Sequence, residues 1–443
     1  MMFLYNLAFL IFGVCYLPIF ILKLRQAENP KVLLKERFGF YRSGKLTGKI
    51  LWLHAVSVGE VMAVRKFIGL FLAQYPNWSM VLTTVTPTGQ KIAKQMESER
   101  LEAHYFPFDF TWAHKNFLKT FRPSAAVLAE TEIWPNLLLE IEKFKIPAGV
   151  INARLSRRSA KRYGSFPAIF EPLFRKLDFV MAQTEEDGAR FASLGIPASK
   201  IQILGNVKFD NSAAEDFVAD KKFFAEWGVT QGDPVLIAGS THPGEEEQLF
   251  DAWIALRQKF PKLKMIVAPR HIERSISILT WMSKDSGIRA CLSSQKPAGG
   301  DYDVLVLDQM GILRRLYALA DVVFMGGSLV KHGGQNPIEP ACFKKAVLYG
   351  PYFFNFQKVY ETLSQNEGAI QVAGGRDLYE VLERMFSDTD ARLRMGENAF
   401  AAIERLRGAS QRHLDRLSPF LNTEERNYNV VNQKLFPQTG GRV

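Results

Sequence analysis

The sequence is poor in cysteine. Its 443 residues include only Cys15, Cys291 and Cys342, which lie far apart along the chain. Small secreted domains that depend on disulfides carry many cysteines at short spacings, so this class is excluded and a reducing compartment is expected. The chain also lacks the cysteine–histidine spacing of zinc fingers and the aromatic motif of common RNA-binding domains. We therefore expect no nucleic-acid partner, although the formal net charge is +11.

Carboxylate and histidine sets with the spacing of metal sites are lacking as well. The one superficial match is Asp301-Tyr302-Asp303, an Asp-x-Asp pattern. It precedes an apolar run that reads as a strand, whereas ligands of parallel sheets bind at the carboxyl ends of the strands. We therefore expect neither a metal nor a cofactor. The positive charge instead favours anionic partners such as a phosphorylated lipid or an acidic membrane surface.

Charged side chains are missing from residues 1–22, which are rich in Phe, Leu and Ile. The run is long enough to span a bilayer, and it lacks the basic start and the small-residue cleavage site of a signal peptide. A buried helix is the alternative interpretation. Lys23, Arg25 and further basic residues up to Arg37 follow the run, and such residues stay on the cytoplasmic side. We expect a membrane anchor over 1–22, with the later residues in the cytoplasm.

The rest of the chain alternates short apolar runs with helical patterns in two halves, 23–210 and 234–421. The predicted strands of the first half are Ile50–Ala55, Met80–Val85, Ala125–Ala129, Gly149–Asn152, Phe179–Ala182 and Ile201–Leu204. Those of the second half are Val235–Ala238, Met265–Ala268, Val304–Leu307, Val322–Met325 and Ala346–Leu348. This alternation predicts two doubly wound, Rossmann-like α/β domains. The polar stretch 211–233 is the expected linker, and 422–443 is expected to be a loose tail.

The second half contains a glycine-rich stretch between a predicted strand and a predicted helix. It runs over 326–341 and includes Gly326-Gly327 and Gly333-Gly334. Glycine pairs allow sharp turns and a close approach of the backbone to a ligand. Asn336-Pro337 is typical of a helix start, where free N–H groups favour an anion. Glu339 either closes a capping box on Asn336 or accepts hydrogen bonds from a ribose, and the glycine pairs favour a nucleotide site.

Several motifs in a fixed order carry a resemblance to a known family. Besides the glycine-rich stretch they are His54–Glu60, Glu130–Asn136, Asn152–Ser156, Gly205–Asp210, Ser240–Glu246 and Pro269–His271. The ordered set covers most of the chain and resembles the 3-deoxy-D-manno-octulosonic acid (Kdo) transferases, which are glycosyltransferases of GT-B fold. The resemblance implies two Rossmann-like domains facing a cleft, with a terminal helix that crosses back to the first domain. It also implies inverting transfer of Kdo from CMP-Kdo to lipid IVA, the lipid A precursor, in lipopolysaccharide biosynthesis.

The resemblance assigns catalytic roles to Glu60, Glu130 and Lys208. Glu60 follows the first predicted strand and a turn at Gly59, which places it at the carboxyl edge of the sheet. There it would act as the general base that takes the proton of the acceptor hydroxyl. Glu130 and Lys208 would stabilise the transition state. From the residues alone, Glu60 is also explained as an acid in the first turn of a helix, where the dipole favours negative charge.

The second half would bind the nucleotide of the donor. The residues expected there are Pro269, Arg270, Met310, Gly311, Ile312, Asn336, Pro337, Ile338 and Glu339. Arg270 follows a predicted strand, and its planar guanidinium suits a phosphate or a carboxylate. In the family the turn at 310–312 usually reads Met-Gly-Glu. Because Ile312 replaces the acid here, backbone N–H groups are expected to serve at this position.

The first half would bind the acceptor. Arg154, Arg157, Arg158 and Arg162 cluster beyond a predicted strand. Such a cluster is typical of a solvated face, but beside a membrane anchor it suits lipid phosphates. The expected partners are CMP-Kdo, a lipid A precursor and lipids of the cell inner membrane. Two alternatives stay open: a GT-B transferase or epimerase that uses a UDP-sugar, and a non-catalytic scaffold that binds membrane lipid.

Overall fold

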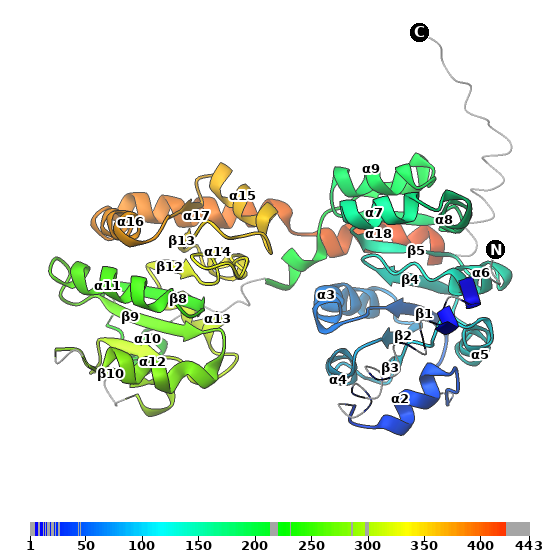
Figure 1. Cartoon of the computed structure of the whole chain (residues 1–443), viewed down its shortest axis with the longest axis horizontal. Helices are drawn as coiled ribbons and strands as arrows, with labels where there is room; N and C mark the ends of the chain where they lie inside the picture. Colours follow the sequence, from blue (N-terminus) through cyan, green and yellow to red (C-terminus); the bar gives the residue numbers. More distant parts are fainter. Residues whose placement is uncertain are drawn as a thin grey trace, which may run out of the picture. The chain divides into compact units, whose positions relative to one another are not determined.

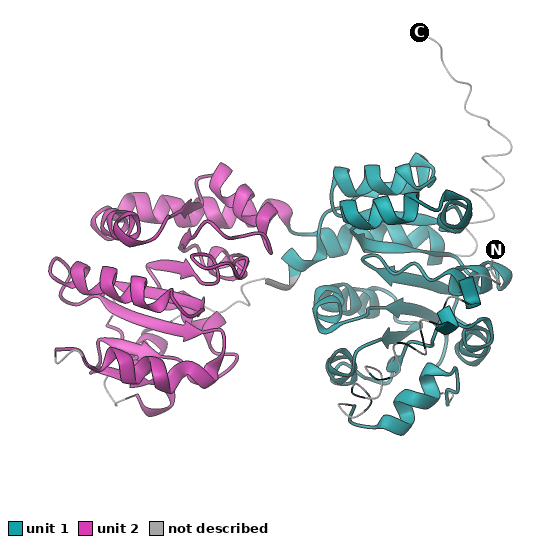
Figure 2. Ribbon diagram, in the orientation of Figure 1, with its two compact units in different colours: residues 1–211, 407–443 teal, residues 212–406 magenta. Residues whose placement is uncertain are grey.

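The computed structural model divides the chain into two compact units (Figure 2). Unit 1 consists of residues 1–211 and 407–443, and unit 2 consists of residues 212–406. The structure describes residues 5–7, 9–11, 13, 15, 18, 22, 24, 27–42, 44, 46–212, 220–230, 232–284, 287–296 and 301–421. The expected tail over 422–443 and most of the expected anchor over 1–22 lie outside the described residues.

Unit 1 is built on a parallel sheet with the strand order β3-β2-β1-β4-β5-β6-β7 (Figure 1). Its strands are β1 (Lys49–His54), β2 (Trp78–Thr84), β3 (Leu101–Tyr105), β4 (Ala125–Ala129), β5 (Ala148–Ala153), β6 (Phe179–Ala182) and β7 (Ile201–Ile203). Its helices include α2 (Pro30–Arg37), α3 (Val58–Gln74), α4 (Pro87–Lys94), α5 (Thr111–Phe121), α6 (Pro135–Lys143), α7 (Arg157–Gly164), α8 (Pro167–Phe174), α9 (Glu185–Ser193) and α18 (Ala409–Leu421). The strand order reverses between β1 and β4, and ligands of such sheets bind beyond the carboxyl ends of these strands.

Helices cover both faces of the unit 1 sheet. Successive residues of β1 point to opposite faces. Trp52 therefore belongs to the core that contains side chains of α5, α6, α8 and α9, whereas Leu51 and Leu53 belong to the core that contains those of α3 and α18. A strand that is buried on both faces is apolar at nearly every position, as in Ala125–Ala129. The cores on the two faces of the sheet hold the strands in place. They therefore also determine where each loop at the carboxyl edge begins.

Unit 2 contains a second parallel sheet, with the strand order β10-β11-β9-β8-β12-β13-β14. Its strands are β8 (Val235–Thr241), β9 (Lys264–Pro269), β10 (Ala290–Leu292), β11 (Val304–Val306), β12 (Val322–Met325), β13 (Ala346–Tyr349) and β14 (Ala369–Gln371). Its helices include α10 (Lys221–Glu226), α11 (Glu246–Arg257), α12 (Ser275–Met282), α13 (Leu313–Leu316), α14 (Ile338–Cys342), α15 (Gln357–Gln365), α16 (Gly375–Ser387) and α17 (Thr389–Leu406). One core joins α11, α12 and α16 to alternate strand residues such as Leu236, Met265 and Phe324. The predicted pair of Rossmann-like α/β domains is confirmed.

The last helix of the described chain, α18, returns to unit 1 after the chain has completed unit 2 (Figure 1). Its apolar face joins the core that contains α3. The Asp210 carboxylate accepts hydrogen bonds from the N–H groups of Gly408 (2.6 Å) and Ser410 (2.5 Å), just before and within this helix. The expected return of a terminal helix is therefore confirmed. The second domain ends at Leu406 instead of residue 421, because helical periodicity does not reveal which core an apolar face joins.

The stretch 211–233, predicted as a linker, is partly folded onto unit 2. It contains α10, and both Trp227 and Val229 are buried. The Trp227 carbonyl accepts a hydrogen bond from the Tyr302 hydroxyl, and the Lys296 ammonium lies 3.5 Å from the centre of the indole ring. The polar composition of the stretch was misleading because a few large apolar side chains are enough to hold it.

Two of the described residues near the N-terminus, Tyr5 and Phe9, contact the helix and loop region around residues 109–110 of the same unit. The Tyr5 hydroxyl donates a hydrogen bond to Asp109 Oδ2 at 2.7 Å, and the ring of Phe9 packs edge-on against Phe110 with centroids 5.4 Å apart. Within the part of the chain that the structure describes, we find no helix with the length and apolar character needed to cross a membrane.

Candidate active site

Glu60 lies at the carboxyl edge of the unit 1 sheet, as predicted. The chain leaves β1 at His54, and Glu60 belongs to the first turn of α3. Its carboxylate accepts hydrogen bonds from the Val56 N–H at 2.7 Å and from the Ser57 hydroxyl at 3.4 Å. These local bonds hold the carboxylate beside the end of β1.

Glu130 and Lys208 form an ion pair at the same edge. Glu130 directly follows β4, the neighbour of β1, and its Oε1 atom lies 2.9 Å from Lys208 Nζ. The backbone of Glu130 is left-handed, with φ of 60°. For a residue other than glycine this conformation costs on the order of 1 kcal/mol or more, and such strain is concentrated at functional sites. The ion pair and the strained turn both lie at the edge of the sheet where ligands of such folds bind.

Lys208 reaches this position from β7, a strand at the edge of the sheet. After β7 the chain runs back across the ends of β6 and β5. Asn206 Nδ2 donates a hydrogen bond to Gln183 Oε1 just beyond β6 (3.0 Å), and the Val207 N–H donates to Asn152 Oδ1 in β5 (3.1 Å). Polar side chains at successive strand ends therefore guide Lys208 toward β4.

Two of the carboxyls at this edge titrate near neutral pH. Burial raises the pKa of Glu60 to about 7; the hydrogen bond from Val56 opposes the rise and the charge of Glu130 adds to it. Burial and the charge of Glu60 raise the pKa of Glu132 to about 7. The resemblance assigns no role to Glu132, which lies in the turn after β4, where the charges of both Glu60 and Glu130 act on it. A carboxyl with such a pKa suits a general base at physiological pH.

A pocket of about 500 Å³ opens beside Glu132. It is lined by Tyr5, Thr131, Glu132, Ile133, Trp134, Pro135, Arg162, Tyr163, Phe166 and Phe170. Aromatic rings make up much of this lining, together with the carboxylate and the Arg162 guanidinium, so the pocket suits an amphipathic ligand. Of the four arginines expected to bind the acceptor, Arg162 lines the pocket, whereas Arg154, Arg157 and Arg158 are exposed after β5 and in the first turn of α7.

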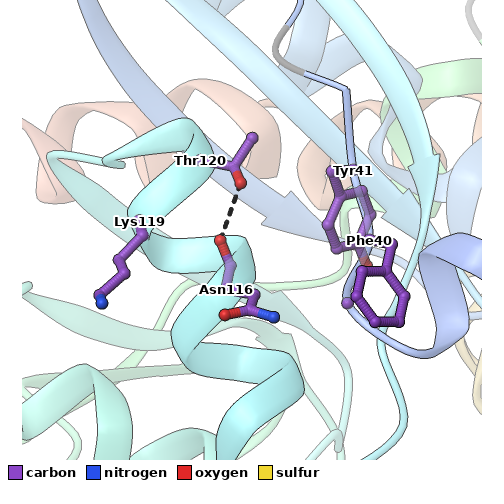
Figure 3. A pocket seen from close by; sticks show the side chains of 6 residues that line it. Phe40, Tyr41, Asn116, Lys119 and Thr120 are labelled. Atoms are coloured by element: carbon purple, nitrogen blue, oxygen red, sulfur yellow. Dashed lines mark hydrogen bonds between the residues drawn. The ribbon is translucent and has the colours of Figure 1, made fainter.

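A second hollow of unit 1, of about 320 Å³, lies elsewhere (Figure 3). Gly39, Phe40 and Tyr41 line it on one side, and Asn116, Lys119 and Thr120 of α5 line it on the other. The α5 residues belong to the later turns of that helix, which run toward the amino ends of the strands. This hollow therefore does not belong to the Glu60 site.

Unit 2 gathers three histidines and an arginine at the carboxyl ends of β8, β9 and β12. The ring of His242 stacks on that of His332 with centroids 4.1 Å apart, and His271 lies edge-on to His242 at 6.1 Å. Burial and the neighbouring His332, His271 and Arg270 lower the pKa of His242 to about 4. Arg270 itself is exposed. This group, which we call the histidine cluster, offers donors and positive charge to a phosphate or a carboxylate.

The glycine-rich stretch does not present its N–H groups to a ligand at 327–329. Those of Gly327–Leu329 donate to the buried Glu245 carboxylate at 2.6–2.9 Å. The glycines serve the loop itself, because Gly327 has φ of 69° and a Cβ on Gly326 would lie 2.4 Å from the Ser240 carbonyl oxygen. The N–H groups of Gly327–Leu329 are therefore occupied within the protein, and the predicted anion at the helix start near Asn336 stays a prediction.

Asn336 and Glu339 lie at the start of α14, which begins at Ile338 after Pro337. Asn336 Oδ1 accepts a hydrogen bond from the Ile338 N–H at 3.2 Å. Burial raises the pKa of Glu339, whereas the charge of Arg314 and a hydrogen bond with Asn336 oppose the rise. The bond joins the Glu339 and Asn336 side chains, whereas a capping box on Asn336 would use its N–H, and Pro337 holds the cap position of α14. The ribose contact stays a prediction.

The remaining nucleotide residues lie at neighbouring strand ends. Pro269 ends β9, and Met310–Ile312 follow β11, the strand beside β9. Met310 is 82% exposed, and Gly311 turns the chain with φ of 84°. The sheet order β11-β9-β8-β12 therefore brings the predicted donor residues to one edge of unit 2.

Comparison with known proteins decides the family. Residues 33–211 match the family described as 3-Deoxy-D-manno-octulosonic-acid transferase (kdotransferase). The chain is 34% identical over 391 residues to the 3-deoxy-D-manno-octulosonic acid transferase of Haemophilus influenzae, an alignment that covers 88% of this chain and 91% of the relative. The chain belongs to the Kdo transferase family. The transferase of the same name from Bordetella pertussis is 30% identical over 382 residues, covering 84% of this chain and 87% of the relative.

In this member of the family, the matched segment 33–211 contains Glu60, Glu130, Glu132 and Lys208. The two-unit fold is shared more widely. A glycosyltransferase from Rickettsia africae ESF-5 superimposes with a TM-score of 0.55 at 14% identity, over 85% of this chain and 99% of that chain. This last likeness concerns the fold alone.

Proposed function

We propose that the protein is an inverting transferase that moves Kdo from CMP-Kdo to lipid IVA, the lipid A precursor of lipopolysaccharide biosynthesis. The observation that carries this proposal is the Glu60 carboxyl, with a pKa of about 7, beside the Glu130–Lys208 ion pair. Membership of the Kdo transferase family supports the identity of the sugar.

In the proposed step, Glu60 takes the proton of the acceptor hydroxyl as that oxygen attacks the anomeric carbon of Kdo. The bond from this carbon to the phosphate oxygen breaks at the same time, and CMP leaves with the bonding electrons. Because the attack displaces the phosphate directly, the anomeric configuration inverts. Lys208, held by Glu130, supplies positive charge against the negative charge that develops at the reacting centre.

The donor is proposed to bind unit 2. The histidine cluster, with Arg270 as its cationic member, would face the phosphate or the Kdo carboxylate, since planar guanidinium and imidazole N–H groups suit these anions. Residues 336–339 would face the ribose, with the Glu339 carboxylate as the acceptor of its hydroxyl hydrogen bonds. Met310–Ile312 would supply backbone groups.

The acceptor is proposed to enter the pocket beside Glu132. Its aromatic lining suits the apolar part of a lipid, and Arg162 at the same pocket suits a lipid phosphate. Arg154, Arg157 and Arg158 would contact further phosphate groups outside the pocket. This arrangement would bring the acceptor hydroxyl to the edge that carries Glu60.

The protein is further proposed to lie at the cytoplasmic face of the cell inner membrane, with residues 1–22 as its anchor. The uncharged run and the basic residues from Lys23 to Arg37 support this location. Tyr5, within the proposed anchor, lines the acceptor pocket, which supports delivery of the lipid from the membrane side.

The proposed function is tested by incubating the full chain with CMP-Kdo and lipid IVA. We expect release of CMP and a lipid product heavier by whole Kdo units, measured by mass spectrometry. A UDP-sugar in place of CMP-Kdo should give no product, and UDP should not compete with CMP for binding. Turnover of a UDP-sugar would favour the epimerase or transferase alternative. Lipid binding without any turnover would favour the scaffold.

A further inference from the structure

A buried carboxylate fills the glycine loop of unit 2. Glu245 is fully buried, with 0% of its surface exposed. Its Oε2 atom accepts hydrogen bonds from the N–H groups of His242 (2.9 Å) and Gly327 (2.6 Å). Its Oε1 atom accepts from the N–H groups of Ser328 and Leu329, both at 2.9 Å. Main-chain donors from the ends of β8 and β12 therefore satisfy both oxygens of one side chain.

Other N–H groups of this loop are also bonded within the protein. Gly326 donates to the Gly239 carbonyl at 2.8 Å, Gly334 donates to the Gly327 carbonyl at 2.8 Å, and Gln335 donates to the Gly326 carbonyl at 3.0 Å. Successive N–H groups that converge on one point form an anion site in many proteins. Here the protein supplies its own anion, so a donor phosphate could occupy this position only by displacing Glu245.

The same carboxylate sets the position of groups in the histidine cluster. It bonds to the backbone of His242, whose Nε2 atom lies 3.3 Å from the amide nitrogen of Gln335 and whose ring stacks on His332. Gly327 lies against the same groups, because a Cβ there would come within 3.3 Å of both the Gln335 and His242 side chains. A shift of the loop would therefore move the histidine cluster as well.

We propose that Glu245 is a positioning residue for the donor site: it occupies the anion position of the glycine loop and fixes His242 and Gln335, so that side chains recognise the anionic groups of the donor. The inference rests on the proposed binding of CMP-Kdo to unit 2. It assigns the N–H groups of Gly327–Leu329 an internal role and leaves phosphate or carboxylate recognition to the side chains of the histidine cluster.

The first test uses the unaltered full chain and amide hydrogen exchange. The amides of Gly327–Leu329 should exchange slowly in the free protein, and saturation with CMP or CMP-Kdo should leave their exchange unchanged, because Glu245 already bonds them. New protection of these amides by the nucleotide would overturn the inference. A chain that fails to bind CMP in calorimetry would instead count against the proposed function, so the two failures are distinguishable.

The second test replaces Glu245 with Gln, which keeps the size but turns one acceptor oxygen into an N–H₂ donor facing two N–H groups. We expect CMP affinity to fall by about tenfold or more, and KM for CMP-Kdo to rise accordingly, because charge-assisted bonds are lost and the loop shifts. The value of kcat should change much less than KM, since Glu60, Glu130 and Lys208 belong to unit 1.

The matched control is Asp303→Asn in the same unit. Asp303 is buried and pairs with Arg257 and Arg289, but it precedes β11 and therefore lies at the opposite edge of the sheet. The Asp303→Asn substitution should lower the melting temperature without changing CMP affinity. If Glu245→Gln behaves like this control, its role is structural only and the inference is wrong. If the variant does not fold, the exchange measurement on the unaltered chain still decides.

Discussion

The Glu60 carboxyl experiences opposing influences on its pKa. Its position in the first turn of α3 favours the charged form, because the positive end of the helix dipole and the Val56 N–H both stabilise a carboxylate. Burial and the nearby charge of Glu130 act in the other direction and raise the pKa to about 7. At this value about half of the molecules carry the group as a base at neutral pH, and the carboxylate retains enough basicity to take a proton.

Glu60→Gln should abolish transfer without abolishing donor binding. Gln keeps the size and suits the first turn of a helix, but it cannot take the proton of the acceptor hydroxyl. Loss of a general base typically lowers the rate by about 10²–10⁴. The measurement is turnover with CMP-Kdo and lipid acceptor, with CMP affinity and melting temperature as controls.

Turnover of Glu60→Gln within a few fold of the parent would remove this residue as the base. Glu130 or Glu132 at the same edge would then become the candidate for the general base. A collapse of the melting temperature in the variant would make Glu60 a structural residue instead.

The pH dependence of the rate should report the Glu60 carboxyl. A base must be unprotonated, so kcat/KM should fall as the pH drops below about 7. In Glu132→Gln the midpoint of this acidic limb should move to lower pH. The charge of Glu60 raises the pKa of Glu132. Because repulsion between two carboxylates is mutual, removal of the Glu132 charge should make the Glu60 carboxylate easier to form.

The pH–rate profile of Glu132→Gln is best compared with that of Glu140→Gln. Glu140 is also a buried carboxylate of unit 1, but it lies within α6 and pairs with Lys143. The acidic limb of this control should stay in place. An unchanged limb in Glu132→Gln would show that Glu132 does not influence the base.

Among the elements, the central strands could be predicted, whereas β7 was the one edge strand among the described residues that the sequence indicated, as Ile201–Leu204. β4 and β12 are buried at every position, and their unbroken apolar runs were recognised with correct ends. β3 lies at the edge of its sheet and carries the half-buried Glu102 and His104, so it has no continuous apolar run. β10 and β14 are edge strands of three residues that were not predicted, although β7 and β11, which are equally short, were.

The site residues that could be predicted are likewise those that local contacts position, whereas those positioned by distant contacts could not be predicted from the residues alone. Glu60 and Glu130 were placed from local spacing, because a strand followed by a turn fixes the edge at which the next residue lies. Lys208 reaches them only because its own segment bonds to Gln183 after β6 and to Asn152 in β5, so the family resemblance was needed to assign its role. Glu245 left no local signal, because its partners in the glycine loop lie more than eighty residues further along the chain.

Glu339→Gln should weaken CMP binding while leaving the fold intact. The loss of a charge-assisted hydrogen bond to the ribose should lower affinity by about ten- to a hundredfold. Calorimetry with CMP measures the effect, and the melting temperature serves as the control. Gln can still bond to Asn336 at the start of α14, so the cap should survive. An unchanged CMP affinity together with a lower melting temperature would leave Glu339 as a cap only.

At the scale of the whole molecule, the chain crosses between the units at two places, after Asn211 and after Leu406. The Asp210 carboxylate lies at the first crossing and binds the N–H groups of Gly408 and Ser410 at the second. His413 Nε2 in α18 then accepts the N–H of Asn152, the residue that also holds the loop before Lys208. One set of hydrogen bonds in unit 1 therefore supports both crossings and the placement of Lys208.

Removal of residues 1–22 should separate the donor and acceptor functions. CMP affinity should be unchanged, because the proposed donor residues belong to unit 2. Association with inner-membrane vesicles should weaken, because the uncharged run is gone. KM for the lipid acceptor should rise for a second reason, since Tyr5 lines the pocket beside Glu132 and bonds to Asp109.

A full chain with Tyr5→Phe separates these two causes. It keeps the apolar run and loses only the hydroxyl that donates to Asp109 Oδ2. Vesicle association should match the parent, while KM for the acceptor rises if the N-terminal segment helps to form the pocket. If KM rises only in the truncated chain, the segment acts through the membrane alone. Loss of CMP binding in the truncated chain would contradict an anchor that is independent of the donor site, because it would make residues 1–22 part of the folding of the whole molecule.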